Sequence, residues 1–203
     1  MTGGVDPGLI RPTQNRRRVL YDNAEIDDIV DVILHADSLS ASFTKDFAQN
    51  FRRETDEETL RVIWTFVKKN IRYVRDKAGI EEVQSPGKLW NRRRGDCKSF
   101  SVFIGSILKN LGYRYKYRLA FYDAANMDSA HIYPIVTLRN GRKVVMDAVH
   151  TRFDEEVPFY KAFDYSPAKG VGAMPEPVQK KPGMGFWIVV AGIFILLTTK
   201  QYD

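Results

Sequence analysis

The residue best suited to covalent chemistry in this 203-residue chain is its single cysteine, Cys97. It follows Gly95-Asp96, where a polar stretch meets an expected helix that runs to about Asn110 and stops at Gly112. The macrodipole and the unpaired N–H groups of a helix's first turn favour thiolate over thiol, so we expect the pKa of Cys97 to lie below about 8.5. On its own, however, a lone cysteine is more often a small buried apolar side chain.

A histidine and an aspartate that follow Cys97 in the chain supply the partners that a thiolate nucleophile needs. The sulfur requires an imidazole within hydrogen-bond reach, and the imidazole requires an acceptor that fixes its tautomer. His131 opens an expected strand over about residues 132–138, and Asp147 lies near the end of the next one, over about 143–149. Whether the two side chains meet depends on the register of this hairpin.

The turn at Asn140-Gly141 allows two registers. If these two residues alone formed the turn, paired positions would sum to 281, and His131 and Asp147 would point to opposite faces of the sheet. If the loop is Arg139-Asn140-Gly141, with Gly141 left-handed, the sum is 280. Asp147 then lies opposite Tyr133 and diagonal to His131, about 7 Å away on the same face. We predict the three-residue loop.

Three separated motifs resemble the transglutaminase-like superfamily of papain-type thiol enzymes. They are Arg94-Gly95-Asp96-Cys97-Lys98-Ser99-Phe100-Ser101, Ala130-His131-Ile132-Tyr133-Pro134-Ile135-Val136 and Asn140-Gly141-Arg142-Lys143-Val144-Val145-Met146-Asp147-Ala148. The resemblance covers about residues 54–149 and implies an α+β papain/transglutaminase-like core, with the nucleophile helix packed on an antiparallel sheet. It implies that Cys97 is the nucleophile, His131 the general base and acid, and Asp147 the residue that orients the imidazole. The aromatic residue two positions after the family's histidine, often Trp, is Tyr133 here.

A tetrahedral oxyanion would be stabilised by the backbone N–H of Cys97 and a second donor upstream. The resemblance implies an amide there, as in papain-type enzymes, or an aromatic side chain, as in transglutaminases. Our candidate is Gln84, thirteen positions before Cys97, with Trp90 as the next choice. Gln84 is equally well an exposed loop glutamine.

The surrounding pattern predicts helices followed by antiparallel strands, the order typical of an α+β fold. Apolar residues at helical spacing favour a first helix over about residues 23–35, and a capping box at Thr55-Asp56-Glu57-Glu58 opens a second. A polar stretch with a turn at Ser85-Pro86-Gly87 leads to the Cys97 helix, and a strand over about 113–122 precedes the hairpin. We interpret Trp64 and Tyr73 as core residues.

Composition excludes several functional classes. One cysteine excludes an internal disulfide framework and a four-cysteine or Cys2His2 zinc site, and three histidines (His35, His131 and His150) supply a metal-dependent hydrolase poorly. We expect no cofactor and no metal. The net charge of +6 and the runs Arg16-Arg17-Arg18 and Arg92-Arg93-Arg94 favour anionic partners only mildly. Since no nucleic-acid-binding motif accompanies these runs, we interpret them as solvated surface and expect no nucleic-acid partner.

The C-terminal part of the chain divides into a linker and the most hydrophobic segment. Residues 166–185 hold four Pro and four Gly, and Phe186–Leu197 follow. As a helix, residues 183–199 would span about 25 Å, against a hydrocarbon core of about 30 Å. We predict a C-terminal hydrophobic helix that anchors the chain in a membrane in a single pass, with the domain on the cytoplasmic side. A buried helix of the domain is the alternative.

The predicted organisation is therefore a flexible N-terminus over residues 1–20, an enzyme domain over 21–165, a linker over 166–185 and an anchor over 186–199. The N-terminus lacks the apolar run of a secretory signal. We expect a membrane-anchored thiol enzyme that transfers an acyl group through a Cys97 thioester, with hydrolysis of an amide or peptide bond favoured. Its partner would be a peptide or protein substrate, with cell-wall peptides as one option, reached for example inside a virus particle. The alternative is a non-catalytic module that tethers a partner to a membrane or a viral shell.

Overall fold

The computed structural model of the chain describes residues 5–13, 17–77, 79–124, 130–167 and 186–191. Its helices are α1 (Ile26–Ser40), α2 (Lys45–Gln49), α3 (Asp56–Asn70), α4 (Pro86–Arg92) and α5 (Cys97–Leu111), with short 3-10 turns η1 (Pro7–Leu9) and η2 (Ala41–Phe43). Its strands are β1 (Arg17–Ala24), β2 (Arg72–Tyr73), β3 (Ile80–Gln84), β4 (Arg94–Gly95), β5 (Arg114–Phe121), β6 (Ala130–Thr137), β7 (Lys143–Val145), β8 (Lys161–Tyr165) and β9 (Phe186–Ala191). This mixture of helices and mainly antiparallel sheet confirms the α+β prediction.

The helix that begins at Cys97 is the centre of the fold. Asp96 caps α5 by accepting a hydrogen bond from the Ser99 N–H at 3.1 Å, and Gly112 ends the helix with φ +83°. Both ends are as the sequence predicts. The helix packs against β6 of the four-stranded sheet, and α1, α2, α3 and α4 also contact it. Its middle is fully buried, with Phe103, Ile107 and Leu108 inaccessible to solvent.

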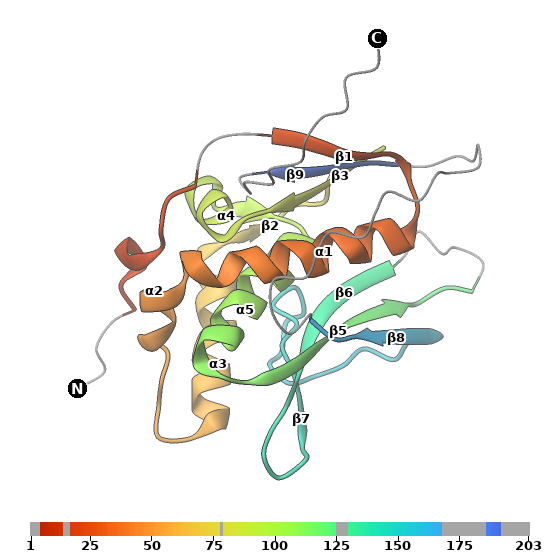
Figure 1. Cartoon of the computed structure of the whole chain (residues 1–203). Coiled ribbons are helices and arrows are strands. Elements are labelled where there is room, and N and C mark those ends of the chain that lie inside the picture. Colours follow the sequence, from red (N-terminus) through yellow and green to blue (C-terminus); the bar gives the residue numbers. More distant parts are fainter. Residues whose placement is uncertain (1–4, 14–16, 78, 125–129, 168–185, 192–203) are drawn as a thin grey trace.

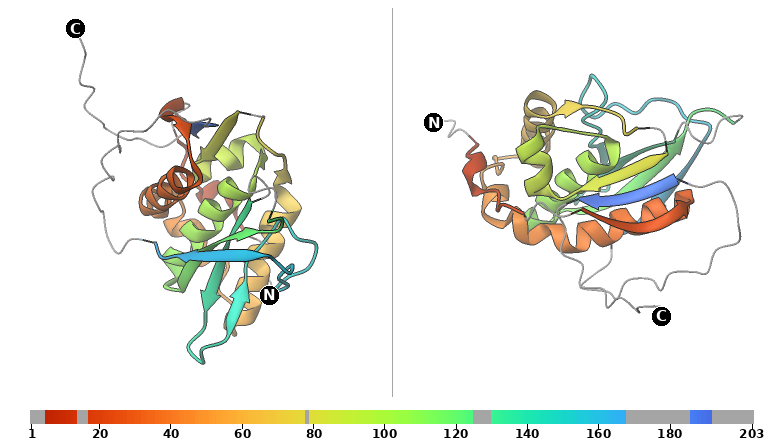
Figure 2. Two further views of the ribbon diagram at one scale, coloured as in Figure 1. Left: turned by 90° about the vertical axis from the view of Figure 1, so that its right-hand side faces the viewer. Right: turned by 90° about the horizontal axis from the view of Figure 1, so that it is seen from above.

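Two sheets lie on different sides of α1 (Figure 1). The four-stranded sheet has the order β7-β6-β5-β8, and all its neighbours are antiparallel. The second sheet has the order β1-β9-β3, and its three strands are seen side by side in the right-hand view of Figure 2. A short parallel pair, β2 with β4, lies just ahead of α5. This last pair fixes the chain that leads into Cys97.

The segment between the second helix and Cys97 differs from its prediction as a polar stretch with a turn. Residues 86–92 form α4, because Ser85 accepts a hydrogen bond from the Lys88 N–H and Pro86 occupies the first helical turn, where its missing N–H is not needed. Gly87 approaches the backbone of Arg11 so closely that a Cβ there would lie 2.6 Å from its carbonyl oxygen. The N-terminal residues therefore pack on α4.

The structure also differs from the prediction at both ends of the chain. Ile10 is only 7% exposed and residues 17–24 form β1, within and just beyond the segment predicted to be flexible. Residues 186–191, predicted to be helical, form strand β9 between β1 and β3. The physical reason is that an extended apolar segment satisfies its backbone groups on both neighbours. The rest of the predicted linker and anchor, residues 168–185 and 192–203, lies outside the described residues. Within the described part of the chain, no helix is both long and apolar enough to cross a bilayer.

Candidate active site

The hairpin formed by β6 and β7 has the register that the sequence predicts. Ile135 pairs with Val145 and Thr137 with Lys143, so paired positions sum to 280. Gly141 has φ +84°, and the hydrogen bond from Leu138 N–H to Arg142 O closes the three-residue loop at 2.9 Å. The three-residue loop is thereby confirmed, and it places positions 131 and 147 on one face.

His131 and Asp147 meet directly. The imidazole Nε2 lies 2.8 Å from Asp147 Oδ2, and the other carboxylate oxygen accepts the Val149 N–H at 2.9 Å. Burial acts to raise the pKa of Asp147, but the hydrogen bonds from His131 and from the backbone of Val149 and His150 outweigh it and hold the pKa below its usual value of 3.8. The carboxylate is thus kept ionised, and it fixes His131 with its proton on Nε2 and its Nδ1 lone pair available.

Two side chains of α3 hold the segment that carries Asp147. Trp64 Nε1 donates to the Asp147 carbonyl oxygen at 2.7 Å, and Lys68 Nζ donates to the Val149 carbonyl oxygen at 2.8 Å. Sequence analysis interpreted Trp64 only as a core residue. The position of Trp64 on the helix predicts that its side chain is buried. Its indole N–H, however, contacts a residue 83 positions away, and no local sequence pattern predicts such a contact.

Cys97 occupies the first position of α5 and is packed against β6 near His131. Ser101, one turn further along the helix, donates its hydroxyl to the Ile132 carbonyl at 2.9 Å, and the Ile132 N–H hydrogen-bonds the sulfur. Burial, together with the smaller effect of the Glu81 and Asp147 charges, nevertheless raises the pKa of the Cys97 thiol to about 12. The predicted lowering of this pKa is wrong, because desolvation and nearby carboxylates outweigh the helix terminus.

The candidate catalytic cleft is the cavity of about 750 Å³ that Cys97, His131 and Asp147 line together. Between Cys97 and His131, both described residues, no direct hydrogen bond is formed. Catalytic hydrogen bonds are often long before substrate binds, so this separation is compatible with the proton transfer required. The phenols of Tyr73 and Tyr122 also line the cleft, although sequence analysis placed Tyr73 in the core. On the other side of the sulfur is an apolar cavity of about 110 Å³ lined by Val30, Ile33 and Leu119 among others.

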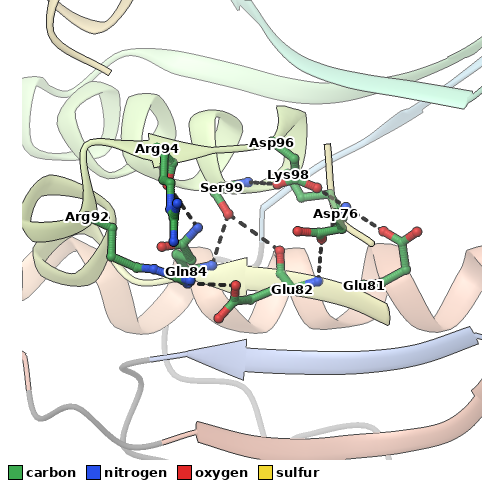
Figure 3. A network of polar contacts seen from close by, with 9 residues as sticks. All are labelled: Asp76, Glu81, Glu82, Gln84, Arg92, Arg94, Asp96, Lys98 and Ser99. Carbon is green, nitrogen blue, oxygen red and sulfur yellow. Dashed lines mark hydrogen bonds and ion pairs between the residues drawn. The ribbon is translucent and has the colours of Figure 1, made fainter. Parts of the chain in front are cut away.

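A buried lysine next to the cysteine holds three carboxylates together (Figure 3). Lys98 is 6% exposed, and its ammonium contacts Asp76 at 3.3 Å, Glu81 at 2.5 Å and the capping residue Asp96. Oxygens of these three carboxylates lie within 4.8 Å of one another, the arrangement from which a divalent cation would be held. Because Lys98 contacts all three, its own ammonium supplies the positive charge there.

Gln84 does not line the cleft that holds Cys97. Its amide Nε2 donates to the Arg94 carbonyl at 3.2 Å, and its side chain lines a neighbouring cavity. Trp90 stacks on Phe66 and lies under Arg93. In this structure neither side chain takes the position of the oxyanion donor predicted from the sequence. The first-turn N–H of Cys97 has no helical acceptor and is the donor that the fold does supply.

Comparison with known proteins places these elements in a family. The family model for the transglutaminase-like superfamily matches residues 45–148, just over half of the chain. No curated protein sequence matches the chain.

Among solved structures, a candidate cysteine protease from Cytophaga hutchinsonii is similar over 68% of this chain and 46% of its own, with 16% identity and a TM-score of 0.48. LapG from Legionella pneumophila is similar in its calcium-bound form over 64% of this chain and 76% of its own, with 14% identity and a TM-score of 0.45. Its EGTA-treated form is similar over 71% and 90%, with 14% identity and a TM-score of 0.46. The chain thus spans less than half the length of the Cytophaga protein. The family match, which includes Cys97, His131 and Asp147, shows that the chain belongs to the transglutaminase-like superfamily.

Proposed function

We propose that this protein is a cysteine hydrolase that cleaves an amide or peptide bond through a thioester on Cys97. The observation that carries the proposal is the 2.8 Å contact between His131 Nε2 and Asp147 Oδ2, in the cleft that Cys97 also lines. A buried carboxylate that fixes an imidazole beside a thiol is the arrangement that activates a sulfur nucleophile.

In the proposed reaction, the Cys97 sulfur attacks the substrate carbonyl carbon, and the thiol proton passes to Nδ1 of His131. A C–S bond forms as the carbonyl becomes a tetrahedral oxyanion, which the backbone N–H of Cys97 stabilises. The imidazolium then gives its proton to the leaving nitrogen as the C–N bond breaks. Water, deprotonated by His131, attacks the thioester, and the carboxylic acid and the thiol are released. Asp147 stabilises the imidazolium throughout.

The pKa of Cys97 defines how this mechanism must begin. Since burial raises the thiol pKa to about 12, the free thiol is neutral at pH 7, and in our proposal transfer of its proton to His131 accompanies the attack on the carbonyl carbon. We therefore expect iodoacetamide to alkylate the free enzyme slowly at pH 7 and increasingly fast as the pH rises above 9.

The test is hydrolysis of fluorescein-labelled casein and of a defined peptide mixture followed by mass spectrometry. Cys97→Ala and His131→Asn should each abolish cleavage, and trapping at low temperature should add the acyl mass to Cys97 in the wild type. His150→Asn is the matched control: the His150 side chain lines the same cleft, but its ring contacts the backbone of Arg152 rather than the Asp147 carboxylate, so cleavage should persist. Cleavage that survives Cys97→Ala would refute the proposal.

A second candidate function is a non-catalytic binding module of the same fold, and the raised pKa of Cys97 favours it. A neutral thiol with no hydrogen bond to the imidazole is also what an inactive site would contain. The two functions differ in one measurement. In an enzyme, His131→Asn slows alkylation of Cys97 by a substrate-like haloacetyl peptide, whereas in a binding module it leaves that rate unchanged.

We propose peptides or proteins as the substrate class, with cell-wall peptides and delivery inside a virus particle as the more specific case. Release of soluble fragments from purified peptidoglycan by the wild type, and not by Cys97→Ala, would support that case. Protein substrates cleaved in its place would leave the hydrolase proposal standing and remove the cell-wall one.

Membrane attachment through residues 186–199 is a separate proposal that competes with strand β9. Residues 186–191 cannot lie in the sheet beside β1 and β3 and in a bilayer helix at the same time. Fractionation of the full chain and of a chain ending at Pro167 separates the two. If only the full chain sediments with membranes, the anchor is supported. If both chains stay in the supernatant and the shorter one melts at a lower temperature, the assignment of residues 186–191 to strand β9 is supported.

A further inference from the structure

A second cavity of about 570 Å³ lies beside the catalytic cleft. We call it the basic pocket, because five cationic side chains line it: Arg75, Lys77, Lys88, Arg92 and Arg94. Two of these belong to the arginine run 92–94, which sequence analysis interpreted as solvated surface. Only two acidic side chains, Asp76 and Glu82, line the same cavity. The lining therefore carries an excess of positive charge.

Strand β3 separates the basic pocket from the cleft. Ile80, Glu82 and Gln84 line the basic pocket, whereas Glu81 lines the cleft, as the alternation of side chains along a strand requires. Arg75 and Asp76 line both cavities. The two cavities therefore meet at Arg75 and Asp76, and a chain bound across Cys97 can reach the basic pocket over that edge.

The acidic side chains of the basic pocket are already paired. Glu82 accepts from Arg92 at 2.7 Å, and Asp76 contacts Lys98 at 3.3 Å (Figure 3). Within the described part of the chain, Arg75, Lys77 and Arg94 form no ion pair, and all three are exposed. Their positive charge is available to a ligand.

Gln84 gives the basic pocket a second, directional feature. The residue is 3% exposed; its Nε2 donates to the Arg94 carbonyl and its backbone N–H to Ser99 Oγ. Its Oε1 is buried and has no hydrogen-bond partner among the described residues. A buried acceptor left unpaired costs about 1–3 kcal/mol, so a ligand that brings an N–H group to this oxygen would recover that energy.

We propose that the basic pocket binds a carboxylate-bearing segment of the peptide substrate. The carboxylate lies among Arg75, Lys77 and Arg94, and a peptide N–H donates to Gln84 Oε1. The identification of the ligand as substrate rests on the proposed hydrolase function. A peptide is favoured over a nucleic acid because Gln84 Oε1 calls for an N–H donor, which a peptide backbone supplies beside a carboxylate side chain.

The test measures binding separately from chemistry, with full-length protein carrying Cys97→Ala. The probes are two fluorescein-labelled octapeptides of alternating Ala and Glu or alternating Ala and Gln, followed by fluorescence anisotropy. The Glu peptide should bind about tenfold more tightly, a difference of about 1.4 kcal/mol, because its carboxylates accept charge-assisted hydrogen bonds that the Gln amides do not form. This preference should shrink as salt is raised from 50 to 500 mM.

Single substitutions in the Cys97→Ala protein test whether the peptide binds in the basic pocket. Arg94→Gln should remove most of the preference for the Glu peptide, whereas Arg114→Gln, an equally exposed arginine on β5, should leave it unchanged. Gln84→Leu should weaken both peptides alike, because it removes the acceptor and not the charge. If that variant melts at a lower temperature, the Arg94 and Arg114 pair still decides the result.

Three results would overturn the proposal: equal affinity for the two peptides, an unchanged preference in Arg94→Gln, or tighter binding of a fifteen-residue oligothymidylate than of the Glu peptide. The proposed hydrolase function fails separately. An inactive wild type whose Cys97→Ala form still binds the Glu peptide through Arg94 would keep the pocket and refute the enzyme. A wild type that cleaves peptides, but whose Cys97→Ala form binds the Glu and Gln peptides equally, would keep the enzyme and refute the pocket.

Discussion

Two walls flank Cys97, and they differ in the interactions that hold them. We call strands β6 and β7 the hairpin wall, and β3 with the residues before α5 the charged wall. On one side, the hairpin of β6 and β7 brings His131 and Asp147 together through backbone register, and the catalytic pair follows from a loop of three residues. On the other side, β3 and the residues before α5 are held by Lys98 and the carboxylates of Asp76, Glu81 and Asp96. Main-chain pairing holds strands on both sides, but only the second wall adds a buried lysine that is surrounded by three carboxylates.

This difference has a chemical consequence. The hairpin wall supplies the base and its orienting group, so changes there should affect turnover. The charged wall supplies the Asp96 cap of α5 and an electrostatic environment that opposes thiolate formation, so changes there should affect stability and the pKa of Cys97. Substitutions on each wall can separate these roles.

The largest effect is expected from Asp147→Asn on the hairpin wall. An amide has no negative charge to stabilise the imidazolium, and because it can donate as well as accept it no longer imposes one tautomer on His131; loss of such a group lowers turnover by about 10²- to 10⁴-fold. The rate constant for peptide cleavage measures this, with a thermal melt to show that the variant is folded. A variant as active as the wild type would mean that Asp147 does not orient the base.

The same substitution should also change how the stability of the fold depends on pH in acid. Because the folded-state pKa of Asp147 lies below 3.8, its ionised form stabilises the fold at neutral pH, and that contribution is lost as the pH falls through the folded pKa. Urea unfolding from pH 6 to pH 2 should therefore show a shallower loss of stability in Asp147→Asn than in the wild type.

On the charged wall, Lys98→Met should lower the free energy of unfolding by about 3–5 kcal/mol. It leaves three carboxylates facing one another with no cation, and breaking a buried ion pair by removing one partner has a cost of this size. Part of the loss should be recovered at acid pH as the carboxylates protonate.

Urea unfolding measures this effect, and Lys109→Met is the matched control. Lys109 pairs with the buried Asp37, but Asp37 keeps hydrogen bonds from the hydroxyls of Tyr115 and Tyr117 when the lysine is lost. The Lys109 variant should therefore lose less stability than the Lys98 variant. Equal losses of unfolding free energy in the two variants would show that the number of carboxylates around Lys98 does not determine the size of the effect.

A smaller effect is expected from Gly141→Val in the loop that sets the hairpin register. A Cβ at Gly141 would contact nothing within 4 Å, so the whole penalty is that of a β-branched residue at φ +84°, about 1–2 kcal/mol. Gly141→Asn should lose less, because asparagine tolerates this conformation. The melting temperature measures both, and cleavage per folded molecule should stay unchanged, since the paired strands keep the register.

The hairpin wall could be predicted from the sequence because its determinants are local. The position of Gly141 and the period of two along a strand each act within a few residues, and on the other wall the Asp96 cap of α5 is equally local. The Thr55 capping box likewise opens α3 as expected. Local signals also explain α4 in retrospect, since Ser85 followed by Pro86 is a helix start as well as a turn.

The charged wall could not be predicted, because its contacts are set by tertiary structure. Nothing local places Lys98 against Asp76, or brings the Gln84 amide to the Arg94 carbonyl. The pKa of Cys97 depends on burial, which the helix-start argument omits. At residues 186–191, a continuous apolar run fits a buried strand as well as a helix, and pattern alone does not decide between them.

The smallest expected effect concerns the thiol, and Glu81→Gln tests it. Glu81 lines the cleft with Cys97, and its charge is one of the causes that raise the thiol pKa to about 12. Removing that charge should lower the pKa and move the pH profile of iodoacetamide alkylation toward neutral pH, while Lys98 keeps its contacts with Asp76 and Asp96. Glu82→Gln is the matched control, since Glu82 is the next residue on β3 but lines the basic pocket. A shift in the Glu81 variant alone would show that charge on this wall sets the reactivity of Cys97. Equal profiles for the two variants would show that the Glu81 charge does not contribute, and would leave burial and the Asp147 charge as the causes of the raised pKa.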